Sequence, residues 1–173
     1  MPETDAEALR ALVVSYTWPP TGGIGVQRAL KLVKYLPDFG VAPTVLTVSN
    51  PSVPLRDEAL CRGVREDVEV LRARTLEPGY GLKQATWTAS ASSRPTVSSR
   101  LKSLAGSAAR AALFPDPQVL WQPGAAAALG RRLLGRSRDD VVFMSGPPFS
   151  QFLLGPLARL RPSTAVVLDY RDE

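Results

Sequence analysis

Apolar and polar positions along this chain follow two alternating periods. Short apolar runs rich in Val and Leu predict strands, and segments with apolar residues three or four positions apart predict helices. The first helical segment is the clearest, because Val26, Leu30 and Val33 share one face while Lys31 and Lys34 fall elsewhere. In chain order we expect a strand at 10–16, a helix at 25–39, a strand at 43–48, a short helix at 55–63, a strand at 68–72, helices at 97–113 and 124–134, a buried strand at 140–144, a helix at 149–160 and a buried strand at 165–169.

This alternation predicts the α/β fold class, with an open parallel Rossmann-like sheet and helices on both faces. A length of 173 residues fits one domain at 1–173, and the Ser-rich segment 88–96 has the composition of a mobile loop. Within the helix at 149–160, Pro156 predicts either a kink or the true start of the helix. The apolar residues of that segment, Phe149, Phe152, Leu153, Leu157 and Leu160, are expected to pack into the core.

A glycine-rich loop, Gly22-Gly23-Ile24-Gly25, joins the first strand to the first helix. Glycines let backbone N–H groups approach a ligand closely, and a helix N-terminus favours an anion, so the loop predicts a phosphate site. A tight turn that binds nothing is the alternative. The two common nucleotide motifs do not fit: Val26-Gln27 stands where a P-loop has Lys-Ser, and the second strand ends in Ser49-Asn50 rather than in the acidic residue of an NAD site.

Two further strand ends carry polar residues that would lie on the same edge of a parallel sheet. After the strand at 140–144, Ser145, Gly146 and Ser150 are candidate contacts at a cleft, as is Tyr16 at the end of the first strand. The strand at 165–169 ends in a charged cluster, from which Asp169, Arg171 and Asp172 are candidates. An ion pair between Arg171 and a neighbouring carboxylate is the alternative interpretation of this cluster.

Composition excludes several classes of chemistry. The chain has no His and only one Cys, so imidazole catalysis, His-ligated metal sites and internal disulfides are excluded, and a cytoplasmic protein is expected. Residues 83–138 contain nine basic side chains and one acidic side chain. Nucleic acid is not expected as a partner, because no recognisable nucleic-acid module accompanies this charge. The segment 97–113 has a basic amphipathic pattern suited to peripheral contact with an anionic membrane, although an ordinary surface helix is the alternative.

Four segments together resemble the N-terminal domain of family 4 glycosyltransferases, which are retaining enzymes of the GT-B fold. They are PPTGGIGVQRALKLVKYLPDFGVAPTVLT from Pro19, DPQVLWQPGAAAAL from Asp116, DDVVFMSGPPFSQFLLGPLARL from Asp139 and VVLDYRDE from Val166. The resemblance implies that Gly22, Gly23, Ile24 and Gly25 approach the donor diphosphate, and that this domain lies mainly on the acceptor side. It departs from the family at Phe149, where members often have His, and the chain stops at Glu173 within a segment resembling Asp-x-Arg-Asp-x-Trp.

The resemblance therefore predicts the acceptor-side domain of a retaining glycosyltransferase that moves a sugar from a nucleotide-sugar donor to an acceptor. The donor is a substrate, and neither a cofactor nor a metal is expected. The donor-binding C-terminal domain would be the missing partner of this domain, so the 173 residues are expected to be inactive alone and no catalytic residue is assigned. The alternative from another class is a non-enzymatic α/β module that binds a small anion or a partner protein. An epimerase of the same fold is a third interpretation, which would also need a second domain.

Overall fold

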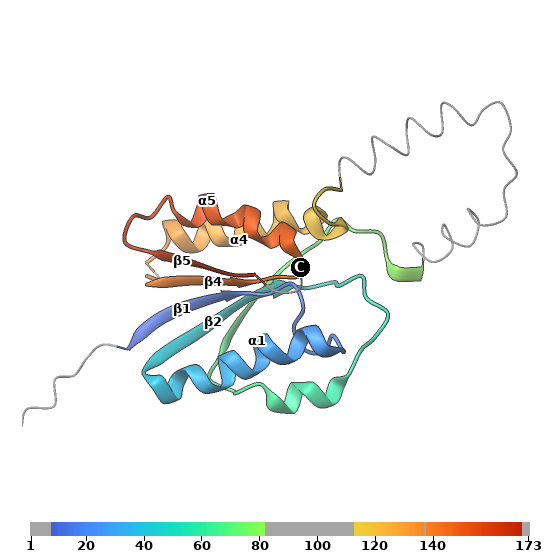
Figure 1. The fold of residues 1–173 in the computed structure, drawn as a ribbon, viewed down its shortest axis with the longest axis horizontal. Coiled ribbons are helices and arrows are strands. Elements are labelled where there is room, and N and C mark those ends of the chain that lie inside the picture. Colours follow the sequence, from blue (N-terminus) through green and yellow to red (C-terminus); the bar gives the residue numbers. More distant parts are fainter. Residues whose placement is uncertain (1–7, 82–112, 137, 171–173) are drawn as a thin grey trace, which may run out of the picture.

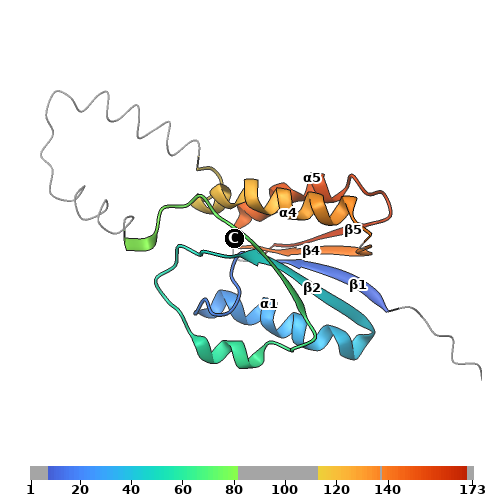
Figure 2. The same ribbon diagram turned by 180° about the vertical axis from the view of Figure 1, so that it is seen from behind.

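A computed structural model describes residues 8–81, 113–136 and 138–170. These residues form a three-layer α/β structure around one five-stranded sheet (Figures 1 and 2). The strands are β1 (Leu9–Val14), β2 (Val41–Val48), β3 (Glu69–Ala73), β4 (Val141–Ser145) and β5 (Ala165–Asp169). The α-helices are α1 (Ile24–Tyr35), α4 (Gln122–Leu134) and α5 (Gly155–Ala158). Four 3₁₀ helices complete the described elements: η1 (Leu36–Phe39), η2 (Glu58–Gly63), η3 (Pro117–Trp121) and η4 (Phe149–Leu154).

The sheet is parallel throughout and has the order β3-β2-β1-β4-β5. Strand β1 lies in the centre, where Val13 is in register with Val45 of β2 on one side and Phe143 of β4 on the other. The chain proceeds outward from β1 in one direction to β3, crosses over, and proceeds outward in the other direction through β4 to β5. This order places the topological switch point between β1 and β4, where ligands bind in open α/β sheets. The predicted fold class is confirmed.

Helices cover the two faces of the sheet unequally. Helix α1 lies on one face, where Val26, Ala29 and Val33 pack against Val13 and Val45. Helices α4 and α5 lie on the opposite face, over a larger core (Figure 1). The regular spacing of Val26 and Val33 on α1 is what the sequence pattern predicted, with Lys31 and Lys34 less buried on the outer side.

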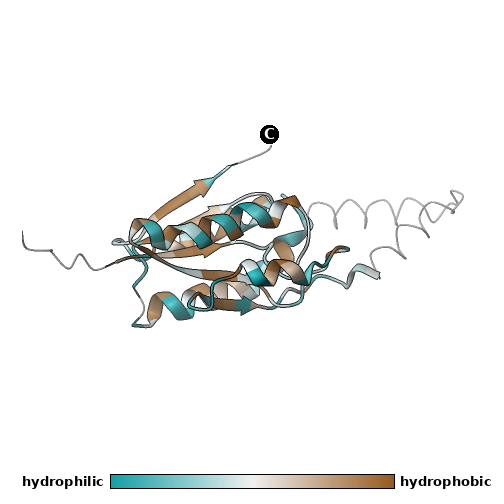
Figure 3. Ribbon diagram, turned by 90° about the horizontal axis from the view of Figure 1, so that it is seen from below, coloured by the Kyte–Doolittle hydropathy of each residue, from teal (hydrophilic) through white to brown (hydrophobic). Residues whose placement is uncertain are grey.

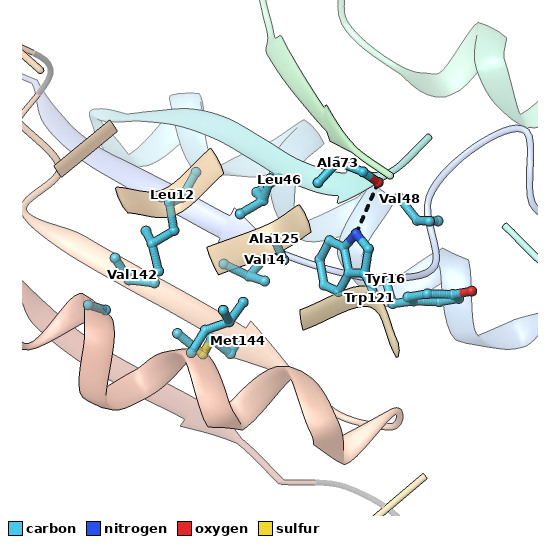
Figure 4. Packing of buried hydrophobic residues seen from close by; sticks show 13 residues of the cluster. Leu12, Val14, Tyr16, Leu46, Val48, Ala73, Trp121, Ala125, Val142 and Met144 are labelled. Atoms are coloured by element: carbon cyan, nitrogen blue, oxygen red, sulfur yellow. Dashed lines mark hydrogen bonds between the residues drawn. The ribbon is translucent and has the colours of Figure 1, made fainter. Parts of the chain in front are cut away.

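Trp121 anchors the larger core at the end of η3. Its side chain is fully buried, and its indole Nε1 donates a hydrogen bond to the carbonyl oxygen of Ala73 at 3.1 Å (Figure 4). Its ring also packs edge-on against Tyr16, with 5.6 Å between ring centroids. Helix α4 follows directly and approaches the end of β3 so closely that a Cβ at Gly124 would lie 2.2 Å from the carbonyl oxygen of Arg74. Glycine is therefore required at this contact.

Arg132 joins α4 to the sheet at the opposite end of the strands. Its guanidinium forms a bidentate ion pair with buried Asp139, at 2.7 and 2.9 Å, and also binds Glu69 and Thr44. Burial lowers the pKa of Arg132, but the hydrogen bonds and charges of Asp139 and Glu69 outweigh burial and raise it. Arg132 is thus a charged side chain with a structural role, which accounts for part of the basic composition of residues 83–138.

The prediction of a buried strand at 165–169 is wrong about burial. Strand β5 exists with the expected bounds, but it is an edge strand in the described part of the chain, and Val167 and Leu168 are 43% and 50% exposed. In Figure 3 it is the apolar strand that leads to the end marked C at the margin of the sheet. An apolar run of this length is typical of a strand covered on both faces, whereas α1 lies over β1 and β2 rather than over β5.

The predicted single helix at 149–160 is also corrected. The segment forms η4 and then the short helix α5, in which Pro156 occupies the first turn, so the alternative that Pro156 marks the true start is confirmed. Leu153 and Leu160 are exposed at 55% and 74%, contrary to the expectation of core packing. A 3₁₀ helix has three residues per turn, which aligns Phe149 with Phe152 and turns Leu153 away.

Three sequence predictions lie outside the described residues: the helix at 97–113 with its membrane contact, the loop at 88–96, and residues 171 to 173. In the described ranges, no helix has the length and apolarity needed to cross a membrane.

Candidate functional site

The glycine loop lies at the carboxyl end of β1, as predicted, and leads directly into α1. The preceding turn is fixed to the 55–57 segment, because the N–H of Gly22 donates to the carbonyl oxygen of Leu55 at 2.9 Å and the N–H of Asp57 donates to Pro20 at 2.8 Å. A Cβ at Gly22 would lie 2.7 Å from Cγ of Leu55. Gly22 therefore packs closely against the Leu55 side chain, and its N–H is already used within the protein.

Gly23, Ile24 and Gly25 form the exposed part of the loop. Gly23 precedes α1 with a φ of 100°, a conformation that favours glycine. No side chain caps α1, and its first turn contains no acidic residue. The first N–H groups of a helix have no partner within the helix, so this terminus presents donors and a positive dipole end to solvent. Ile24, the first residue of α1, is 90% exposed.

Arg28 connects this helix to the ends of two strands. Its Nε and Nη2 donate to the two carboxylate oxygens of Asp169 on β5 at 2.6 and 2.8 Å. The hydroxyl of Ser145 at the end of β4 donates to the same carboxylate at 2.6 Å. The hydrogen bond to Asp169 raises the pKa of Arg28, which stays charged. We name Gly23, Gly25, Arg28, Ser145 and Asp169 the edge site.

The structure thus brings together Ser145 and Asp169 from the predicted set and adds Arg28, which sequence reasoning missed. The sequence did contain a signal for Arg28. This residue lies three positions after Gly25, and so one turn along the exposed side of a helix that starts at the glycine loop. Arg171 and Asp172 lie outside the described residues, and so does the proposed ion pair of Arg171. Asp169 is paired with Arg28 instead.

Tyr16 is placed beneath the edge site, in the core. It is 1% exposed, and its hydroxyl donates a 2.5 Å hydrogen bond to Oε1 of buried Glu77. Burial, followed by the hydrogen bond to Glu77, raises the pKa of Tyr16 well above its ordinary value of 10.0. In this structure the hydroxyl therefore serves an internal contact, and its assignment to an acceptor stays a prediction.

Gln151 is a second residue that sequence reasoning missed. It is fully buried, its Oε1 accepts from the N–H of Tyr16 at 3.2 Å, and its Nε2 donates to the carbonyl oxygen of Ser145. This amide links the ends of β1 and β4 at the switch point. A glutamine among aromatic and leucine residues gives no pattern by which this role could be recognised from sequence.

The remaining two candidates of the β4 loop have backbone roles. Ser150 is fully buried and donates its N–H to Asp116 at 2.8 Å, while its hydroxyl has no partner in the described part of the chain. Gly146 donates its N–H to the carbonyl oxygen of Asp169 at 3.0 Å. A Cβ on Gly146 would lie 2.7 Å from Cδ1 of Phe149, whose ring stacks on Tyr170 with 4.7 Å between centroids. Phe149, the position where the resemblance leads one to expect His, is thus part of an aromatic pair beside the edge site.

An apolar groove of about 650 Å³ starts at Ile24 and Arg28 and follows α1 to Phe39, with Phe143 of β4 along its other wall. In the described ranges no group of three or more His, Cys, Asp or Glu side chains is arranged to hold a metal ion. The edge site therefore offers backbone donors, one guanidinium paired with one carboxylate, and one hydroxyl that donates to the same carboxylate.

No protein-family model matches the chain, and no curated protein matches it. Among solved structures, the chain is similar to UGT2 of Phytolacca americana, a GT-B glycosyltransferase solved with UDP-2-fluoro-glucose and pterostilbene. The TM-score is 0.51 and the sequence identity 14%, over 95% of this chain and 31% of that chain. The chain therefore spans about a third of the length of UGT2.

The chain is also similar to the C-terminal domain of the PF1911 hydrogenase from Pyrococcus furiosus. The identity is 17% over 98% of this chain and 96% of that chain, with a TM-score of 0.46. At these identities similarity concerns the fold alone. The chain has a Rossmann-like α/β fold of the kind found in one half of a GT-B protein.

Proposed function

We propose that this chain is the N-terminal, acceptor-side domain of a retaining family 4 glycosyltransferase, and that its edge site binds the diphosphate of a nucleotide-sugar donor. The observation that carries the proposal is the open N-terminus of α1 with Arg28 one turn behind it. The shared fold with UGT2 supports a GT-B-like domain, and the four sequence segments that resemble family 4 support the finer assignment.

A diphosphate would receive hydrogen bonds from the N–H groups of Gly23, Gly25 and Val26 and a positive charge from Arg28. Two nitrogens of Arg28 bind Asp169, and its Nη1 makes no hydrogen bond to the described residues, so it can bind a ligand oxygen without releasing Asp169. Asp169 and Ser145 then orient the guanidinium. A leaving diphosphate gains charge during sugar transfer, and preorganised donors of this kind stabilise that charge.

In this proposal the second, donor-binding domain supplies most of the nucleotide contacts, so the 173 residues alone transfer no sugar. The acceptor would approach from the side of the aromatic pair, Phe149 and Tyr170. No metal or cofactor takes part in this proposal. The domain would act in the cytoplasm, where nucleotide sugars are available.

The test is a titration of the chain with UDP, followed by backbone amide chemical shifts. The amides of Gly23, Gly25 and Val26 are expected to move most, and Arg28→Gln should weaken binding by about tenfold to a hundredfold, because a charge-assisted hydrogen bond contributes about 1.5–3 kcal/mol. Arg65→Gln is the matched control, since Arg65 also forms a bidentate pair, with Asp67, on another surface.

Equal weakening by the two substitutions, or shifts that cluster elsewhere, would contradict the site. Equally tight binding of inorganic pyrophosphate and UDP would favour the alternative of a small-anion module. Sugar transfer from a nucleotide sugar by the 173 residues alone would contradict the assignment of the activity to two domains.

A further inference from the structure

Exposed leucines and arginines gather at the end of the molecule opposite the edge site. Helices α4 and α5 lie side by side and both end at the amino ends of the strands. Leu134 at the end of α4 is 91% exposed, and Leu160, two residues after α5, is 74% exposed. The two leucines line one groove of about 350 Å³ between the helix ends. Both are large apolar side chains that remain exposed to solvent in the folded chain.

Exposed arginines lie at the same helix ends as the two leucines. We use the term basic corner for the exposed residues at these helix ends, which are Arg131, Leu134, Arg136, Arg138, Arg159 and Leu160. In the described ranges, none of the four arginines forms an ion pair, unlike Arg132 beside them, which is held by Asp139 and Glu69. The neighbouring acid, Asp140, lines the same pocket as Arg136 and Arg138 and accepts the backbone N–H of Arg10, so its charge offsets one of the four positive charges. The corner therefore carries an excess of positive charge.

We propose that the basic corner binds the surface of an anionic phospholipid bilayer. Charge complementarity favours this occupant, because arginine guanidinium groups pair with lipid phosphates while exposed leucines enter the boundary between headgroups and acyl chains. Weak apolar insertion and weak electrostatic attraction together give stable binding where either alone is marginal. A nucleic acid would use the arginines but would leave Leu134 and Leu160 without a role.

This inference rests on α4 and α5 and is independent of the proposed function and of the segment 97–113. It also predicts an orientation. The corner and the edge site lie at opposite ends of β4, which is five residues long, and so they are separated by roughly 15 Å or more of strand. A chain bound through the corner keeps the edge site directed away from the bilayer, open to water-soluble ligands.

The experiment is cosedimentation of the full chain with vesicles of phosphatidylcholine, with or without an equal amount of phosphatidylglycerol. Binding is expected only with phosphatidylglycerol and should fall at high salt. Arg136→Gln with Arg159→Gln should lower the partition coefficient roughly 30-fold, at about 1 kcal/mol per arginine. Leu134→Ser with Leu160→Ser should lower it about tenfold or more.

Matched controls keep the result interpretable. Arg56→Gln with Arg62→Gln removes two exposed arginines from another surface, and Leu153→Ser removes another exposed leucine, so both should leave binding unchanged. All substituted residues are exposed, and circular dichroism should show that each variant folds. The proposal is overturned by absence of pelleting, by equal losses in the controls, or by loss only when Arg100, Lys102 and Arg110 are replaced. It is also overturned if the arginine variants lose binding and the leucine variants do not, the result expected of a surface for nucleic acid.

Discussion

Two glycines of helix α4 should respond to the same substitution with opposite signs. A Cβ at Gly124 would lie 2.2 Å from the carbonyl oxygen of Arg74 and 3.2 and 3.3 Å from its N and C atoms. All three are backbone atoms at the end of β3, so α4 must move away from the sheet to accept a methyl group. Overpacking of this kind costs about 1–3 kcal/mol. At Gly130, by contrast, nothing lies within 4 Å of the added Cβ.

We therefore expect Gly124→Ala to lower the free energy of unfolding by about 1–3 kcal/mol. Gly130→Ala should raise it by about 0.5–1 kcal/mol, because alanine favours the helix over glycine. Urea denaturation followed by circular dichroism measures both values. Because Trp121 binds Ala73 beside the contact, its fluorescence should change in Gly124→Ala and stay the same in Gly130→Ala. Two variants that are stabilised alike would refute the close approach of α4 to β3.

Three further substitutions test the buried polar groups. Tyr16→Phe leaves Glu77 without its 2.5 Å donor and should cost about 1–3 kcal/mol in urea denaturation. Since the pKa of Tyr16 is raised in the folded state, its contribution is present below pH 10.0 and is lost as the pH rises above that value, so the alkaline decline of stability should be smaller in Tyr16→Phe. Arg132→Met leaves the Asp139 carboxylate, whose side chain is 2% exposed, without this ion-pair partner and should lower the free energy of unfolding by about 3–5 kcal/mol. A loss under about 1 kcal/mol would contradict the buried pair. Ser150→Ala removes a buried hydroxyl that has no partner among the described residues and should leave the midpoint of thermal unfolding equal or higher, whereas a marked decrease would show that this hydroxyl has a partner.

The architecture could be predicted because it depends on periodicity and chain order. The spacing of Val26, Leu30 and Val33 placed α1 within a few residues of its observed bounds. The apolar runs gave all five strands, and alternation with helices implied the parallel sheet. The glycine loop was placed correctly at the carboxyl end of β1 for the same reason.

The predictions that failed concern features that depend on contacts between residues far apart in the sequence. Burial of β5 is decided by which helices cover its faces, and an apolar run that is typical of a covered strand does not show that those helices are present. Arg28 and Asp169 are 141 positions apart, and Gln151 and Tyr16 are 135 apart, so only the folded sheet brings each pair together. The predicted helix at 149–160 failed because α and 3₁₀ helices share nearly the same apolar spacing over a few residues.

The exposed side of β5 has a consequence for the behaviour of the protein in concentrated solution. Edge strands are commonly protected from intermolecular pairing by charged side chains, proline or a bulge. From Ala165 to Leu168 this strand has none of the charged or proline residues, and Val167 and Leu168 present apolar side chains to solvent. In the part of the chain that the structure describes, no strand pairs with the outer side of β5, so its backbone N–H and C=O groups there can accept the strand of another molecule. Aggregation by strand addition should begin at β5, and shielding this edge should raise the solubility of the protein.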